Sequence, residues 1–231
     1  MISKKKISIV TILLAAFLLL ASSTVVQAAV NPLAKMPRKD SGVANTAITG
    51  KGWNFMTPEY SSKVKIQVKS YNPKIATIKG HTAQNSSNKK YYAGYEIFCV
   101  SPGTAKLKVT VTVTVNSKSY TKICNYTVYK WENPFKTLKI GSKNYLPKFN
   151  KSGYYVSQKD ISGQVFSFKI NPNYTFVGAS CLKNNPFSSV QLKPGNNVLP
   201  KNAYSVSVRV ESKKNSHFYT INIHIPQNSP Y

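Results

Sequence analysis

Acidic side chains are scarce in this 231-residue chain, which holds 6 Asp and Glu against 32 Lys and Arg, for a formal net charge of +26. So few carboxylates exclude the acidic cages that bind hard metals, and they leave little for paired acid–base catalysis. Histidine and cysteine number 3 each and show no ligand-like spacing. Phosphate-binding loops, EF-hand loops and serine-hydrolase motifs are also missing. We therefore expect no enzyme, no cofactor and no bound metal, and we assign no catalytic residue.

The chain also lacks a long helical repeat, and its single long apolar run, Ile7 to Leu20, follows three lysines and precedes the small-residue sequence Val26-Gln27-Ala28. This order of features is that of a secretory signal peptide, which is predicted over residues 1–28. The alternative is an uncleaved signal anchor, although the run is shorter than the roughly 20 apolar residues of a membrane helix. Neither a lipoprotein cysteine nor a Leu-Pro-x-Thr-Gly sequence follows it. We expect a secreted protein whose association with a cell wall, if any, is non-covalent.

Almost all of the basic residues are lysines, with arginine only at Arg38 and Arg209. Lysine acts as a diffuse point charge, whereas base-edge readout and bidentate phosphate recognition favour arginine. An A-rich genome would raise lysine, but it would raise glutamate as well, and glutamate is rare here. The lysines are expected at nearly every outward strand position, where they attract polyanions such as teichoic acids, anionic glycans, extracellular DNA or lipid headgroups. No sequence-specific nucleic-acid binding is expected.

Alternating apolar and polar residues predict a first β domain over residues 51–130, after a leader, linker or first-strand approach over residues 29–50. Residues 63–69 alternate aliphatic side chains with lysine and glutamine, and residues 105–115 alternate aliphatic side chains with lysine and threonine. Both runs are typical of strands with one buried face. Residues 81–94 are polar and are predicted to form a loop.

A hairpin turn at Asn116-Ser117 is predicted to pair Val115 with either Lys118 or Tyr120. In both registers the paired residue numbers have an odd sum. Because side chains alternate along a strand, this parity puts one set of residues on the face of the valine row: Tyr120, Cys124, Tyr126 and Val128.

A second strand-rich segment covers residues 133–226. Strands are predicted around 138–140, 165–170, 174–182, 204–210 and 219–225. The last two form a hairpin with Val210 opposite Tyr219, which leaves a four-residue loop over 213–216. The predicted fold class is therefore all-β, with two tandem β-sandwich domains after the signal peptide. The second sandwich rests on strand period and length alone.

Two segments of the first domain resemble the bacterial immunoglobulin-like domain, group 2. One is Ser70-Tyr71-Asn72-Pro73-Lys74-Ile75-Ala76-Thr77-Ile78, and the other is Val100-Ser101-Pro102-Gly103-Thr104-Ala105-Lys106-Leu107. The resemblance covers residues of about 60–130 and departs from the family in the long polar insert and the two cysteines. It implies an immunoglobulin-like sandwich that serves as a surface or secreted spacer or binding module, with no catalytic residues to carry over.

Cys99 and Cys124 form the candidate disulfide. The resemblance puts Cys99 at an inward position before a turn, and the hairpin parity points Cys124 inward as well. In an exported protein these thiols can form a cross-sheet bridge if their Cα atoms lie within about 7 Å. The alternative is two small buried apolar residues. Cys181 is expected to be an unpaired strand residue.

The sequence Lys89-Lys90-Tyr91-Tyr92 in the polar insert is the candidate ligand-contact site, because exposed aromatic rings beside lysines suit anionic sugars or nucleic acid. The favoured alternative is that these tyrosines cover an end of the sandwich. The expected function is that of an exported, non-enzymatic binding or spacer module on anionic cell-wall polymers or glycans, with other surface proteins as further partners. The rival functions are a secreted cationic effector acting on anionic membranes and, third, an enzyme built from Lys, Tyr or Ser.

Overall fold

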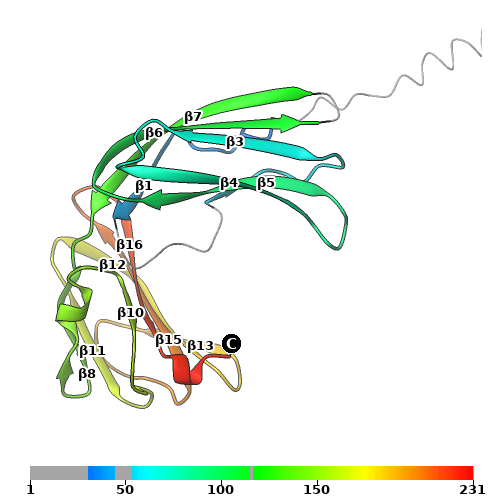
Figure 1. Cartoon of the computed structure of the whole chain (residues 1–231). Helices are drawn as coiled ribbons and strands as arrows, with labels where there is room; N and C mark the ends of the chain where they lie inside the picture. Colours follow the sequence, from blue (N-terminus) through cyan, green and yellow to red (C-terminus); the bar gives the residue numbers. More distant parts are fainter. Residues whose placement is uncertain (1–30, 45–53, 115–116, 231) are drawn as a thin grey trace, which may run out of the picture.

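The computed structural model describes residues 31–44, 54–114 and 117–230, and in these residues the chain is all β (Figure 1). Four sheets make two sandwiches. The first combines the sheets β1-β7-β6-β3 and β2-β5-β4, and the second combines β10-β16-β15-β12-β13 with β14-β11-β8-β9. The predicted all-β sandwich class is confirmed. The predicted signal peptide lies outside the described residues.

The first sandwich is built around the alternating run of the long strand β6. Its strands are β1 (Lys39–Ala44), β2 (Phe55–Met56), β3 (Val64–Ser70), β4 (Ala76–Gln84), β5 (Tyr91–Cys99), β6 (Gly103–Val113) and β7 (Lys118–Lys130). The side chains of Leu107, Val109 and Val111 are fully buried between the sheets. Burial of each such side chain stabilises the fold by about 1.5–3 kcal/mol.

The β6–β7 hairpin has the predicted parity but a different register. Val113 pairs with Lys118, and Leu107 pairs with Cys124. The paired part of β6 therefore ends two residues earlier, at Val113 and not at Val115, than in either predicted register. The odd sum is kept, so Cys124, Tyr126 and Val128 are buried on the valine face as predicted.

The segment before residue 45 belongs to the first sandwich and is not a free leader. Strand β1 runs parallel to the carboxyl-terminal half of β7, from Lys39 opposite Asn125 to Ala44 opposite Lys130. Leu33 and Met36, in the turn before it, are buried in the same core as Leu107. A short parallel edge strand shows no clean alternation in sequence. Of the predicted alternatives for residues 29–50, the first-strand approach is the one that β1 bears out.

The polar insert is mostly strand, so the prediction of a loop over 81–94 is wrong. β4 and β5 continue as a long hairpin from Ala76 opposite Cys99 to Gln84 opposite Tyr91. The turn itself is fastened by Glu59, whose carboxylate accepts hydrogen bonds of 2.7 Å from the side-chain amides of Asn85 and Asn88.

The two sequence segments that resemble the immunoglobulin-like family contact each other. The Ile75 carbonyl accepts hydrogen bonds from the Val100 and Ser101 amides, at 2.8 and 3.2 Å. The Ser101 hydroxyl donates to the Lys74 carbonyl at 2.6 Å. Gly103 has φ +144°, and a Cβ placed there would lie 2.5 Å from Cδ1 of Ile75. Glycine at this turn therefore allows the chain to pass directly over Ile75.

The second sandwich encloses an aromatic-rich core. Its elements are β8 (Phe135–Ile140), β9 (Lys143–Asn144), η1 (Leu146–Phe149), β10 (Tyr154–Val156), β11 (Val165–Ile170), β12 (Tyr174–Lys183), β13 (Ser188–Leu192), β14 (Gly195–Val198), β15 (Ala203–Ser212), β16 (Phe218–His224) and η2 (Pro226–Asn228). Phe149, Phe166 and Phe168 are fully buried in it. Val210 pairs with Tyr219, which confirms the predicted register of the last hairpin.

Side chains from both sandwiches meet where the chain passes from β7 to β8. The indole nitrogen of Trp131 donates to the Phe149 carbonyl at 2.8 Å, and its ring lies 5.7 Å from the ring of Tyr219. Val43 of β1 packs against the core of the second sandwich. The Ser41 hydroxyl lies 2.9 Å from Nδ1 of His217. These contacts join β1 to the β15–β16 hairpin, as Figure 1 shows for the strands.

Candidate polyanion-binding surface

The outer face of the sheet β1-β7-β6-β3 carries lysines that the strand registers bring together. We call this outward side the lysine face, and its lysines are Lys39, Lys65, Lys69, Lys106 and Lys108. Lys69 lies directly opposite Lys108. Among the described residues of these four strands, no acidic side chain shares the outward parity. Like charges on opposed positions destabilise a sheet, so the free protein bears a cost at this face that a bound polyanion would relieve.

Paired hydroxyl groups extend the lysine face beyond Lys108, toward the β6–β7 turn. Thr110 and Thr121 hydrogen-bond across β6 and β7 at 2.9 Å, and Thr112 and Ser119 do so at 2.7 Å. Each hydroxyl has one donor and two acceptor positions, so a hydrogen-bonded pair retains one donor for a ligand. The face therefore offers neutral hydrogen-bonding groups next to its charged positions.

A shallow hollow of about 530 Å³ lies at the edge of the lysine face beside β7. Its lining residues are Arg38, Lys106, Thr121, Lys122, Ile123 and Asn125. The ammonium group of Lys122 donates to the carbonyls of Leu33 and Ala34, at 3.0 Å each, and so holds the turn that precedes β1. Arg38 adds a planar guanidinium fork, which matches phosphate or carboxylate oxygens. The hollow thus extends the lysine face toward the amino-terminal segment.

Lysines are not spread over all outward strand positions, which corrects the sequence-based expectation. The strands β1, β3, β6 and β7 contain eight lysines in total. The five strands of the sheet β10-β16-β15-β12-β13 contain one, Lys183. Sequence alone does not reveal this asymmetry, because it depends on which strands become neighbours.

The four residues of the candidate ligand-contact site are not gathered into one patch. Lys89 and Lys90 are exposed in the turn between β4 and β5. Tyr91 packs against the small core cluster that contains Val64 and is bonded to the backbone of Tyr60. Tyr92 is the next residue along β5 and therefore points to the opposite face of the sheet.

The three cysteines are free thiols, so Cys99 and Cys124 are not bridged in this structure. Sγ of Cys99 lies 3.7 Å from the Tyr126 hydroxyl. Burial raises the pKa of the Cys124 and Cys181 thiols to about 11 each, and it also raises the pKa of Cys99. At neutral pH these thiols are protonated, which makes them poor nucleophiles and poor metal ligands.

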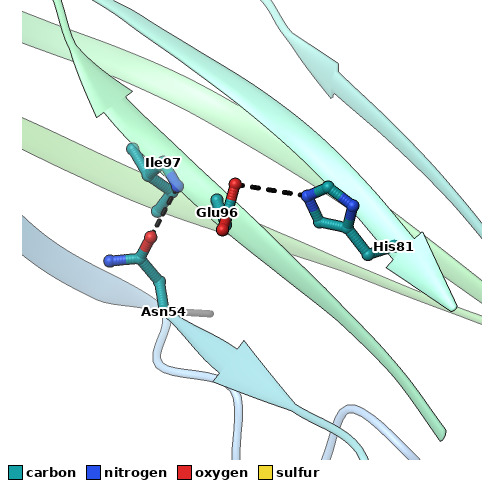
Figure 2. A network of polar contacts seen from close by, with 4 residues as sticks. All are labelled: Asn54, His81, Glu96 and Ile97. Carbon is teal, nitrogen blue, oxygen red and sulfur yellow. Dashed lines mark hydrogen bonds and ion pairs between the residues drawn. The ribbon is translucent and has the colours of Figure 1, made fainter. Parts of the chain in front are cut away.

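An ion pair that sequence spacing did not indicate lies on the outer face of the sheet β2-β5-β4 (Figure 2). Nε2 of His81 is 3.2 Å from Oε2 of Glu96, although the cross-strand partner of Glu96 is Lys79. Beside it the side-chain oxygen of Asn54 accepts a hydrogen bond from the Ile97 amide at 2.6 Å. Figure 2 shows these groups tying three neighbouring segments together. We assign the network a structural role.

The described ranges contain neither a metal-binding cluster nor a membrane-spanning helix. In residues 31–44, 54–114 and 117–230, no group of three or more His, Cys, Asp or Glu side chains is placed to hold a metal ion. No helix in the part of the chain that the structure describes is long and apolar enough to cross a membrane.

Comparisons with known proteins find similarity only to solved structures of β domains. No family model and no curated protein matches the chain. One similar solved structure is that of the zebrafish RET cadherin-like domains 1 to 4, with 10% identity over 70% of this chain and 42% of that one and a TM-score of 0.23. Another is that of the Clostridium thermocellum CbhA fibronectin(III)-like modules, with 9% identity over 69% of this chain and 94% of that one and a TM-score of 0.25. A third is that of the N-terminal four Ig domains of Dscam1 isoform 4.44, with 11% identity over 83% of this chain and 45% of that one and a TM-score of 0.18. The chain spans less than half the length of the first and third. At these TM-scores the likenesses carry no functional weight, and the assignment to group 2 stays a prediction.

Proposed function

We propose that this protein is an exported, non-enzymatic bacterial surface module of immunoglobulin-like type, which associates with anionic envelope polymers through the lysine face. The observation that carries the proposal is the pairing of Lys69 opposite Lys108 on a face whose described strand residues include no outward acidic side chain. Such a pairing lowers the stability of the free protein and becomes favourable when a polyanion lies across both strands.

The chemistry of the face favours a flexible polymer of repeated anionic units over a compact ligand. Lys65 and Lys69 lie four residues apart on one strand, and Lys106 and Lys108 lie two apart on the neighbouring strand. These separations are about 13 Å and about 6.6–6.8 Å along the strands. The hydroxyl pairs next to the lysines suit sugars or polyols that link the anionic groups. In this proposal the second sandwich acts as a spacer, which separates a further binding partner from the polymer.

The test compares two charge-matched variants on an immobilised polyphosphate column. In one, Lys65, Lys69, Lys106 and Lys108 are replaced by Gln. In the other, four exposed lysines of the second sandwich are replaced by Gln: Lys136, Lys139, Lys143 and Lys169. Both variants lose the same net charge, so a difference in elution salt reports the location of the binding surface.

We expect the lysine-face variant to elute at clearly lower salt than the second variant. Each charge contact with the polymer adds roughly 0.7–0.9 to the slope of log affinity against log salt, so four lost contacts should lower the slope by about 3. Equal slopes in the two variants would refute a localised site. The rival function, a cationic effector on anionic membranes, predicts release of dye from anionic phospholipid vesicles, whereas the proposed module should bind them without leakage.

A further inference from the structure

The sheet β10-β16-β15-β12-β13 presents an outer face that differs in charge from the rest of this basic protein. We call it the neutral face, and the residues that share its outward parity include Ser180, Gln191, Ser205, Ser207, Asn222 and His224. Lys183, the one lysine of these strands, pairs with buried Ala203 at the end of β12. Among the described residues of the five strands, no lysine shares the outward parity.

Two opposite charges lie side by side on the neutral face. Arg209 and Glu211 are two residues apart on β15 and point to the same side. The guanidinium carbon of Arg209 lies 4.3 Å from the centroid of the Phe218 ring, so the ring holds the cation in place. Within the described residues Glu211 has no ion-pair partner, and Arg209 pairs with no carboxylate.

We propose that the neutral face binds the neutral face of a second copy of this chain. A twofold axis that crosses β15 between Arg209 and Glu211 sets each residue of one copy opposite its counterion in the other. One arginine and one glutamate from each copy thus form two equivalent ion pairs across the interface. The small serine and asparagine side chains around them let the sheets approach closely, and exposed Phe218 adds apolar area at the rim.

The charge of the whole chain argues for self-association at this face rather than elsewhere. With a formal net charge of +26, two copies repel each other wherever lysines meet, and the lysine face is the extreme case. The neutral face is a large sheet surface whose five strands carry no outward lysine among their described residues. This inference is independent of the proposed polymer binding, because it uses a different sheet of the other sandwich.

Salt dependence separates self-association from polymer binding. Added salt shortens the Debye length from about 30 Å at about 0.01 M to about 3 Å at about 1 M. It therefore screens the overall repulsion between two copies, while the partly buried central ion pairs are screened less. The mass of the full chain measured by sedimentation equilibrium should approach that of a dimer as salt is raised, whereas polymer binding should weaken. A mass that stays monomeric at all salt concentrations, or that falls with salt, would overturn the proposal.

Charge-reversal variants test the ion pairs themselves. Arg209→Glu leaves four carboxylates in the interface, and Glu211→Arg leaves four guanidinium groups. Each should weaken dimerisation by more than about tenfold, because like charges in contact cost several kcal/mol. The double variant R209E/E211R restores opposite charges and should recover dimerisation. Failure of the double variant to recover, with its fold intact by circular dichroism, would overturn the pairing.

A matched lysine insertion tests the face as a whole. Ser207→Lys places a cation on the neutral face and should abolish the dimer. Ser119→Lys places the same cation on the lysine face and should leave dimerisation unchanged, because that face stays outside the interface. Equal loss in both variants would show that net charge, and not the neutral face, controls self-association, and it would overturn the proposal.

Discussion

The Ser41 hydroxyl lies 2.9 Å from Nδ1 of His217, and this contact joins an edge strand of one sandwich to the last hairpin of the other. The imidazole lies between two tyrosine rings, 5.4 Å from that of Tyr129 and 5.5 Å from that of Tyr219. Its burial lowers the pKa of His217, while the Asp40 carboxylate opposes this effect. The junction between the sandwiches is therefore built for a neutral imidazole.

The free energy of unfolding should decrease in mildly acidic solution because of His217. The unfolded chain binds the proton near the ordinary pKa of 6.5, and the folded chain binds it only at lower pH. Stability is therefore complete above pH 6.5 and falls as the pH drops through 6.5 toward the folded pKa. Urea midpoints measured at about pH 7.5 and about pH 5 should differ for the wild type, and the difference should shrink in His217→Gln.

Glu59 and Asp160 do not interfere in that window. Hydrogen bonds from Asn85 and Asn88 lower the pKa of Glu59 below 4.5, and the Ser162 amide lowers that of Asp160 below 3.8. Their effects appear at more acidic pH. An unchanged pH dependence in His217→Gln would show that the junction does not sense protonation.

Gly103→Ala should destabilise the first sandwich by about 1–3 kcal/mol, because an alanine there is strained at positive φ. The added methyl group also meets Cδ1 of Ile75. Gly178→Ala is the control, since no atom lies within 4 Å of a Cβ at that position. Denaturant midpoints should drop for the first variant and stay level or rise for the second. Equal midpoints would refute the close approach of the two sequence segments.

Lys108→Glu should stabilise the unbound protein by about 0.2–1 kcal/mol, because it replaces a like-charge pair with Lys69 by an opposite-charge pair. The same variant should bind polyphosphate more weakly. Lys106→Glu, which faces Asn125, should lose binding without the same gain in stability. A common gain in both variants would assign the effect to net charge.

Thiol titration should find three free cysteines that react slowly in the folded protein. Burial raises the pKa of Cys124 and Cys181 to about 11, so little thiolate exists at about pH 8. Mass spectrometry after alkylation in urea, without reductant, should show three adducts. A single adduct would mean that Cys99 and Cys124 form a disulfide.

Local pattern predicted the strands whose two faces differ most in polarity. The valine row of β6 and the paired rows of β15 and β16 were placed on their correct faces, because period two survives a shift of two residues in the turn. Two elements were missed because their inward side chains are small or few. The extension of β4 and β5 buries Ala93 under a polar sequence, and β1 is a parallel edge strand.

The candidate surface was harder to predict, since it depends on contacts between distant segments. The excess of lysine is visible in the sequence, but its concentration on one sheet is not. Lys69 and Lys108 are opposed only because β3 and β6 are neighbours, although β4 and β5 separate them in the chain. Other contacts between distant segments leave no outward lysine on the described strands of the neutral face and bring Ser41 to His217.

The parallel pairing of β1 with β7 has a mechanical consequence. Their six residue pairs run from Lys39–Asn125 to Ala44–Lys130 in a single direction. Tension applied at the amino end of β1 and the carboxyl end of β7 slides the two strands lengthwise, so it loads every rung of the ladder at once. A strand peeled from its end would instead lose one rung at a time. Force applied between these two ends should therefore meet more resistance than force that peels β1 from one end.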